Sequence, residues 1–187
     1  MESPGIDAGR GALGHALSHQ GIHSFGEVLH YLHYLPYQRI SDPEDCSLVL
    51  AEGRGTCSTK HALLKALARE QGWPGFALIL CMYGMHERNT PGIGAGIARA
   101  GLAYLPEAHC YVRYRNEDID ITRPGASIER IRPDILAEIE ISPAQVGRWK
   151  RSYHRQYLQN WISEQKITYS LDEIWSIRED CIAALAQ

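Results

Sequence analysis

The stretch EGRGTCSTKHALLKALAREQGWP, residues 52–74, predicts a helix with a cysteine in its first turn. Thr56 is a favoured capping residue, alanines and leucines supply an apolar face, and Gly72 is a typical helix-ending residue before the Trp-Pro pair. Cys57 therefore meets unpaired backbone N–H groups and the positive end of the helix dipole, both of which favour the thiolate. Cysteine is also among the most often buried residue types, so its position leaves a nucleophilic role and a packing role both open.

The composition is typical of a globular chain with a single core. The 187 residues are 44% hydrophobic and 22% charged, which favours one domain. A net charge of -3 gives no broad attraction to nucleic acid or to an anionic membrane, and no apolar run is long enough to span a bilayer. The five cysteines lack paired short spacings and the N-terminus lacks the apolar core of a secretion signal. We therefore expect reduced thiols and a cytoplasmic protein.

Most of the chain outside this stretch has helical signals. Residues 1–21 are rich in Gly, Ser and His and predict a loose N-terminal arm or a short helix, and residues 22–187 predict a single domain. Apolar spacing predicts a helix from Phe25 to the LPYQRI turn, and a second helix capped by Asp42 in SDPEDCSLVLAEG. Residues 132–187 predict C-terminal helices, the first of them in RPDILAEIEI.

A buried strand and a long loop follow the Cys57 helix. The short apolar run GFALILCMYG, bounded by glycines, is typical of a buried strand. Residues 84–106 are rich in glycine and predict a mobile flap. The GIGAG sequence within them does not match the dinucleotide-binding fingerprint, because the required spacing and the strand-to-helix context are missing.

The segment AHCYVRYRNEDIDITRPG, residues 108–125, predicts a β-hairpin with Arg115 and Asn116 as its turn. The expected pairs are Tyr114 with Glu117, Val112 with Ile119 and Cys110 with Ile121. The face formed by these pairs is mostly apolar and is expected to pack on the core. The other face then carries polar side chains from both strands.

That polar face suggests a proton-transfer pair. In the predicted register Asp120 is the diagonal neighbour of His109, at a backbone separation of roughly 7–8 Å that side chains can bridge, whereas Asp118 lies one pair further away. A histidine with a carboxylate at one ring nitrogen keeps its other nitrogen available as a base, which is the arrangement that activates a thiol. Together with Cys57, the hairpin therefore completes a candidate Cys-His-Asp constellation. Without Cys57 the same residues would be interpreted as a solvated surface.

Three segments, GRGTCSTKHALLKALAREQGWP, EAHCYVRY and DIDITRP, resemble the core of the transglutaminase-like superfamily of papain-related thiol enzymes. The resemblance covers about residues 47–124 and implies an α+β fold in which helices pack on a small, mainly antiparallel sheet. It also implies that Cys57 is the nucleophile, His109 the base and Asp120 the orienting acid. Backbone N–H groups near Cys57 are the expected oxyanion donors, with Gln38 and Ser58 as supporting residues.

The expected reaction is thiol-dependent acyl transfer on the amide of a peptide or protein substrate. Hydrolysis of a peptide-like or isopeptide-like bond is favoured, because the short chain shows no second domain to build the dry channel that cross-linking requires. One alternative is protein-glutamine transamidation. Another is a non-catalytic binding module that retains the fold. No cofactor is expected.

Metal binding and nucleic-acid binding are weaker interpretations. His61 follows Cys57 by four residues, but no CxxC pair exists, and His109 and Cys110 are adjacent strand residues that point to opposite faces. The helix after Ser142 interleaves basic residues with aromatic ones. Its aromatic residues, Trp149, Tyr153, Tyr157 and Trp161, recur every four positions. This spacing favours a packing stripe over a stacking surface for single-stranded nucleic acid.

Overall fold

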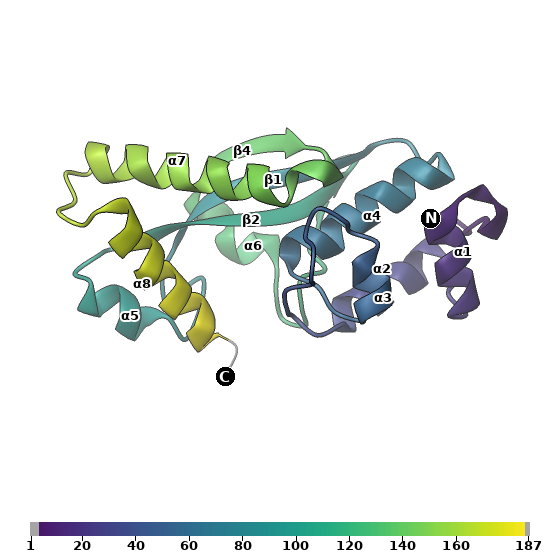
Figure 1. Ribbon diagram of the computed structural model, residues 1–187, viewed down its shortest axis with the longest axis horizontal. Helices are drawn as coiled ribbons and strands as arrows, with labels where there is room; N and C mark the ends of the chain where they lie inside the picture. The colour runs from purple at the N-terminus through teal and green to yellow at the C-terminus, as the bar shows by residue number, and fades with distance from the viewer. Residues whose placement is uncertain (1–3, 186–187) are drawn as a thin grey trace. The chain divides into compact units, whose positions relative to one another are not determined.

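The computed structural model describes residues 4–185 and has an α+β fold (Figure 1). The helices are α1 (Ala12–His19), α2 (Phe25–Tyr34), α3 (Leu48–Glu52), α4 (Cys57–Gln71), α5 (Gly94–Arg99), α6 (Ile128–Ile131), α7 (Arg148–Glu164) and α8 (Leu171–Ala184). Short 3-10 helices are η1 (Ala8–Arg10), η2 (Arg132–Asp134) and η3 (Pro143–Gln145). The strands are β1 (Phe76–Met85), β2 (Leu105–Tyr114), β3 (Glu117–Ile119) and β4 (Ile135–Ile141).

The four strands form one sheet in the order β3-β2-β1-β4. Strands β2 and β3 are antiparallel, and their register confirms the predicted pairs Val112 with Ile119 and Tyr114 with Glu117. Arg115 adopts a left-handed conformation, with φ 57, at the tight turn between them. The predicted α+β class and the predicted hairpin are therefore confirmed.

The described residues divide into two compact units, where the sequence predicted one domain over residues 22–187. The first unit contains the described residues up to Leu80, together with Cys110–Ile128 and Ile139–Arg148. The second contains Cys81–His109, Glu129–Glu138 and the described residues from Trp149 onward. The division crosses β1, β2 and β4, so each of these strands contributes residues to both units.

The first unit is built around α4 and an aromatic cluster. Thr56 caps α4, Gly72 ends it in a left-handed conformation with φ 70, and most of the helix is buried. Phe25 of α2 packs edge-on against Phe76 of β1 at 5.3 Å between ring centroids, and Phe76 stacks on Tyr114 of β2 at 4.2 Å. Such aromatic pairs add about 0.5–1.5 kcal/mol each beyond their burial, so they stabilise the contact between these elements.

The sequence left two alternatives for residues 1–21, a loose arm or a short helix. Within the described residues this segment forms the short helix α1, which contacts α4 (Figure 1). The Glu70 carboxylate accepts hydrogen bonds from the backbone N–H groups of Leu13 (3.1 Å) and Gly14 (2.7 Å). Gln71 accepts from the N–H of Asp7 at 2.8 Å and donates to its carbonyl at 3.1 Å. Glu70 and Gln71 are more than fifty residues away from the N-terminal groups that they bind. The composition of residues 1–21 alone therefore suggested a loose arm.

The second unit packs α7 and α8 around buried polar groups. Arg178 of α8 forms a bidentate ion pair with Glu107 of β2, with both nitrogen–oxygen distances at 2.7 Å. His154 of α7 donates from Nε2 to the Pro106 carbonyl at 2.9 Å. The Trp161 ring nitrogen donates to the Tyr104 hydroxyl at 3.0 Å. These contacts satisfy polar groups that would otherwise be costly to bury.

Two predicted helices are wrong in part or in full. Helix α3 begins at Leu48 rather than at Asp42, because the side chains of Asp42 and Asp45 hydrogen-bond the backbone N–H groups two residues further on and form turns instead. Residues 135–141 form β4 rather than a helix. The isoleucines of ILAEIEI, at positions 135, 139 and 141, fit the two-residue period of a strand.

Two further segments differ from expectation. The glycine-rich stretch 84–106 contains α5, which contacts α8. On α7 the buried residues are His154, Leu158, Trp161 and Ile162, whereas Trp149 is 37% exposed and stacks on Tyr153 at 5.3 Å. At about 100° per residue, positions 149 and 161 lie roughly 120° apart around the helix. Residues spaced by four therefore cannot all face the same core.

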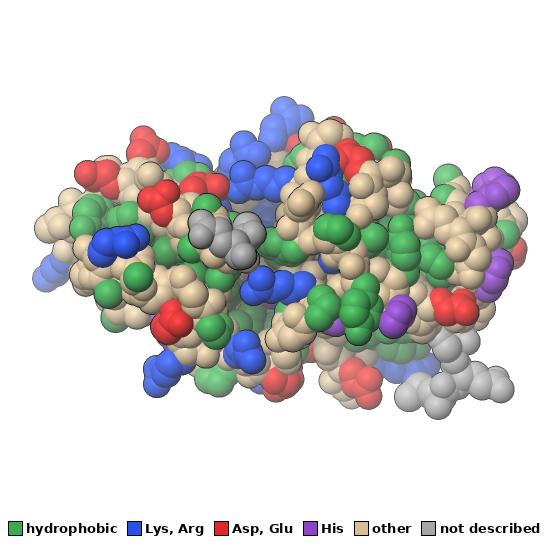
Figure 2. All heavy atoms as spheres, turned by 90° about the horizontal axis from the view of Figure 1, so that it is seen from below, with side chains coloured by type: hydrophobic (Ala, Val, Ile, Leu, Met, Phe, Trp, Pro, Cys, Tyr) green, Lys and Arg blue, Asp and Glu red, His purple; other side chains and the backbone are tan. Residues whose placement is uncertain are grey.

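The surface carries side chains of both charge signs. On the face shown in Figure 2, acidic and basic groups occur among hydrophobic and neutral ones, in keeping with the small net charge of -3. None of the helices in the described part of the chain is long and apolar enough to cross a membrane.

Candidate functional site

Cys57 is the first residue of α4, as the sequence predicted. The Thr56 N–H donates to Thr59 Oγ1 at 2.9 Å, and the Thr59 N–H donates back to Thr56 Oγ1, so this capping box fixes the helix start. Cys57 is only 6% exposed as a residue, and its sulfur lies 3.8 Å from Ser58 Oγ. The thiol is therefore held at the positive end of a well-ordered helix.

The segment around Gln38 lies beside the turn that precedes Cys57. The Gly55 N–H donates to the Pro36 carbonyl at 3.1 Å, and the Gln38 N–H donates to the Gly55 carbonyl at 3.2 Å. These two bonds make a short parallel bridge between Tyr37 and Gly55. The PYQR segment is therefore in place next to the start of α4, with the Gln38 side chain exposed.

His61, which the sequence suggested only as a metal ligand, links the start of α4 to the chain after β3. Its Nδ1 lies 2.6 Å from the Cys57 carbonyl and its Nε2 lies 2.9 Å from the Ile121 N–H. A carbonyl only accepts and an N–H only donates, so the ring must be the neutral form with its proton on Nδ1. Both nitrogens thus bind backbone groups.

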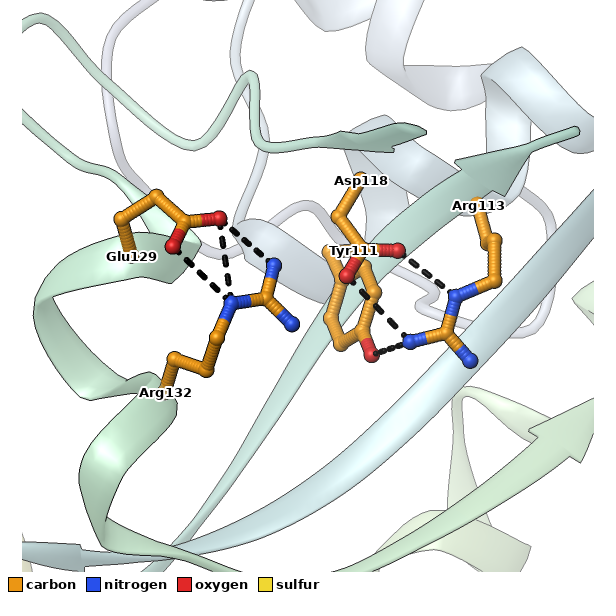
Figure 3. Close-up of polar contacts among 5 residues, drawn as sticks. All are labelled: Tyr111, Arg113, Asp118, Glu129 and Arg132. Carbon is orange, nitrogen blue, oxygen red and sulfur yellow. Dashed lines mark hydrogen bonds and ion pairs between the residues drawn. The ribbon is translucent and has the colours of Figure 1, made fainter. Parts of the chain in front are cut away.

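Asp120 and Asp118 have different partners. Asp120 Oδ1 accepts from the Thr122 N–H at 3.0 Å and lies 3.8 Å from His61 Nε2, with the carboxylate only 5% exposed. Asp118 pairs with Arg113 at 2.7 and 3.2 Å, and Arg113 also donates to the Tyr111 hydroxyl (Figure 3). The Asp118 carboxylate is therefore bound to Arg113, whereas the Asp120 carboxylate faces His61 near the start of α4.

Lys60 places a buried ammonium in the same unit. Its residue surface is 0% exposed, and Nζ donates to the Leu35 carbonyl at 2.7 Å and to the Thr122 carbonyl at 2.8 Å. Burial lowers the pKa of Lys60 to about 8, and the negative charges of Cys57 and Asp120 oppose that shift. The Lys60 side chain thus links three segments: the end of α2, the start of α4 and the chain after β3.

The structure places the predicted site residues as follows. Cys57, Ser58, Gln38 and Asp120 all lie in the first unit. His109 lies on β2 in the second unit, half-buried, with its ring edge-on to Tyr83 at 6.4 Å between centroids. The assignment of His109 as the base thus stays a prediction from the sequence.

Sequence reasoning missed the structural importance of Lys60 and His61. Both are polar residues in a helix that was expected to bury only one apolar face, yet both are fully buried. The available signal was their position three and four residues after the candidate nucleophile, directly before the mostly apolar run that begins at Ala62. Within residues 4–185, no group of three or more His, Cys, Asp or Glu side chains is arranged to hold a metal ion.

The environments of the thiols predict an order of reactivity. No disulfide joins the five cysteines. Burial and the neighbouring Asp45 raise the pKa of Cys46 to about 11, and burial likewise raises the pKa of Cys181. Both remain protonated near neutral pH, so we expect limiting iodoacetamide to label Cys57 first in the native protein. Mass spectrometry of the tryptic peptides measures the order, and earlier labelling of Cys46 or Cys181 would remove the main physical support for Cys57 as nucleophile.

Comparison with known proteins gives no relative for this chain: no family model matches it, and no curated protein or solved structure is significantly similar to it.

Proposed function

We propose that this chain is a thiol-dependent acyl hydrolase with a transglutaminase-like core, in which Cys57 attacks the carbonyl of a peptide-like or isopeptide-like amide. One observation supports this most: Cys57 begins a capped helix, and Lys60, three residues further on, places a fully buried ammonium on the same helix. A thiol that serves only to fill the core has no need of these features. The sequence motifs around Cys57, His109 and Asp120 support the same chemistry.

The proposed reaction has two steps. The Cys57 thiolate adds to the amide carbonyl, the His109 imidazolium gives its proton to the leaving amine, and the carbon–nitrogen bond breaks to leave a thioester. Water then gives a proton to His109 and adds to the thioester, which releases the free acid and the Cys57 thiolate. Asp120 holds the imidazole, and backbone N–H groups at the start of α4 stabilise the oxyanion.

Hydrolysis and transamidation differ only in what attacks the thioester. We therefore propose to offer glutamine-containing and amide-containing peptides with and without a dansylated alkylamine, and to follow the products by mass. Free acid is the expected product, absent in Cys57→Ala and retained in Cys46→Ala, the matched control. Amine adducts that dominate in a Cys57-dependent way would instead establish transamidation. No product across a broad panel would overturn the enzyme assignment and favour a binding module.

A further inference from the structure

The burial of the Lys60 ammonium costs folding free energy. Long charged side chains are almost never fully buried without a partner, because the charge loses its hydration. The two acceptors of Lys60, the carbonyls of Leu35 and Thr122, are neutral. A neutral donor would satisfy them at lower cost. The positive charge itself therefore calls for an explanation beyond hydrogen bonding.

We propose that Lys60 is a positioning residue that holds Cys57 in its thiolate form and fixes the two chain segments beside it, an inference that rests on the proposed role of Cys57 as nucleophile. Cys57 and Lys60 are three residues apart on α4, a spacing that places side chains on neighbouring positions of one helix face. A cation in a low-dielectric environment stabilises an anion there more strongly than it does in water. Lys60 thus adds to the effect of the helix dipole.

The charged groups around Lys60 agree with this assignment. Cys57 is the larger of the two negative influences on the pKa of Lys60, and Asp120 is the smaller. His61, the other titratable neighbour, faces Asp120 and is the neutral tautomer. Glu52, at the end of α3, is instead bound to Arg54 at 2.7 Å and to the Ser41 backbone. The candidate nucleophile and the candidate orienting acid thus both favour the charged form of Lys60.

The chain also makes room for Lys60 at Gly55. A Cβ added at Gly55 would lie 2.9 Å from Lys60 Cγ and 3.3 Å from a methyl group of Val49, which is too close for the lysine stem to stay in place. The absence of a side chain at this position leaves space for the lysine stem. The same glycine carries the backbone bonds to Pro36 and Gln38, so the lysine and the PYQR segment meet at one turn.

The decisive experiment compares Lys60→Met with Lys65→Met. Lys65 is on the same helix and also donates to a backbone carbonyl, that of Phe76, so it is the matched control. The rate of Cys57 alkylation by iodoacetamide is measured against pH, with the labelled peptide quantified by mass. We expect Lys60→Met to move the midpoint up by about one pH unit and to slow labelling at pH 7 about tenfold. Lys65→Met should leave the profile unchanged.

A loss of thermal stability in Lys60→Met with an unchanged alkylation midpoint would overturn the inference, because it would show that Lys60 acts only structurally. This readout does not depend on turnover. If the unsubstituted protein hydrolyses no amide but the midpoint still moves, the proposed function fails and the Lys60 inference stands. If it hydrolyses amides and the midpoint does not move, only the Lys60 inference fails.

A second measurement decides the matter if Lys60→Met does not fold. Coupling between two titrating groups is reciprocal, so loss of the Cys57 thiolate must lower the pH at which Lys60 titrates. The chain has four lysines, and the Lys60 signal in a carbon-13 NMR titration is the one that remains when Lys65, Lys150 and Lys166 are replaced. We expect this signal to titrate at lower pH in Cys57→Ala. An unchanged midpoint would overturn the inference.

Discussion

Asp120→Asn is expected to slow Cys57-dependent amide hydrolysis roughly a hundredfold or more, because the proposed mechanism makes the Asp120 carboxylate responsible for holding the catalytic imidazole. Asparagine keeps the size of the side chain and can still accept the hydrogen bond from the Thr122 N–H. The substitution therefore removes the charge with little change of shape. Steady-state kinetics on the peptide identified by the product screen, together with the rate of Cys57 alkylation, measure the effect.

Asp118→Asn is the matched control for this prediction. Asp118 lies on β3, two residues before Asp120, but it is bound to Arg113, which is partly exposed. The loss of its charge should therefore slow hydrolysis less than about threefold. Thermal midpoints of both variants show whether they are folded. Equal losses of activity would contradict the choice of Asp120 as orienting acid. Faster alkylation in Asp120→Asn would show that Asp120 acts mainly as a counter-charge to Lys60.

The second large effect is on stability, at the ion pair between Glu107 and Arg178. We expect Glu107→Gln to lower the free energy of unfolding by about 3 kcal/mol at pH 7, because it removes the buried partner of a largely buried guanidinium and leaves only the more exposed Glu179, at 2.6 Å, as a counter-charge. The control is Glu129→Gln. Glu129 pairs with Arg132 (Figure 3), but its side chain is 69% exposed, so the expected loss is below about 1 kcal/mol. Urea denaturation of each variant provides the comparison, and equal losses would contradict the prediction.

The same ion pair predicts a dependence of stability on pH. Burial alone would raise the pKa of Glu107, but attraction by Arg178 and His154 and hydrogen bonding by Arg178 lower it below the usual value of 4.5. The stabilisation is therefore complete above about pH 4.5 and is lost as pH falls through the lowered pKa. The difference in unfolding free energy between the unsubstituted protein and Glu107→Gln should shrink over that range. A constant difference from pH 7 to pH 3 would contradict this account.

The parts of the fold that were predictable have local signals. The start of α4 follows from Thr56 and its end from Gly72, and the hairpin register follows from the alternation on either side of Arg115. The start of α3 was not predictable in the same way, because the turns formed by Asp42 and Asp45 compete with a helix cap that uses the same residue types. Strand β4 was missed because its leucine, alanine and glutamates are also good helix formers, although its isoleucines fit the two-residue period of a strand.

Two positions near the candidate site were predictable, but the contacts of its side chains were not. The place of Cys57 at a helix start follows from Thr56, and the predicted register places Asp118 opposite Arg113. The environment of Lys60 could not be predicted, since its two carbonyl partners are 25 and 62 residues away in the chain. The contacts of His61 could not be predicted either, because both nitrogens of its ring bind backbone groups.

The close approach of Gly55 to Lys60 has a consequence for how this chain can vary. Because a Cβ at position 55 would collide with the lysine stem, the two positions are not independent. Sequences that share this core should show them changing together: lysine at position 60 should occur with glycine at position 55, and a larger residue at 55 with a shorter side chain at 60. Covariation of a glycine with a lysine five residues later would therefore identify distant members of this protein's lineage better than the cysteine alone.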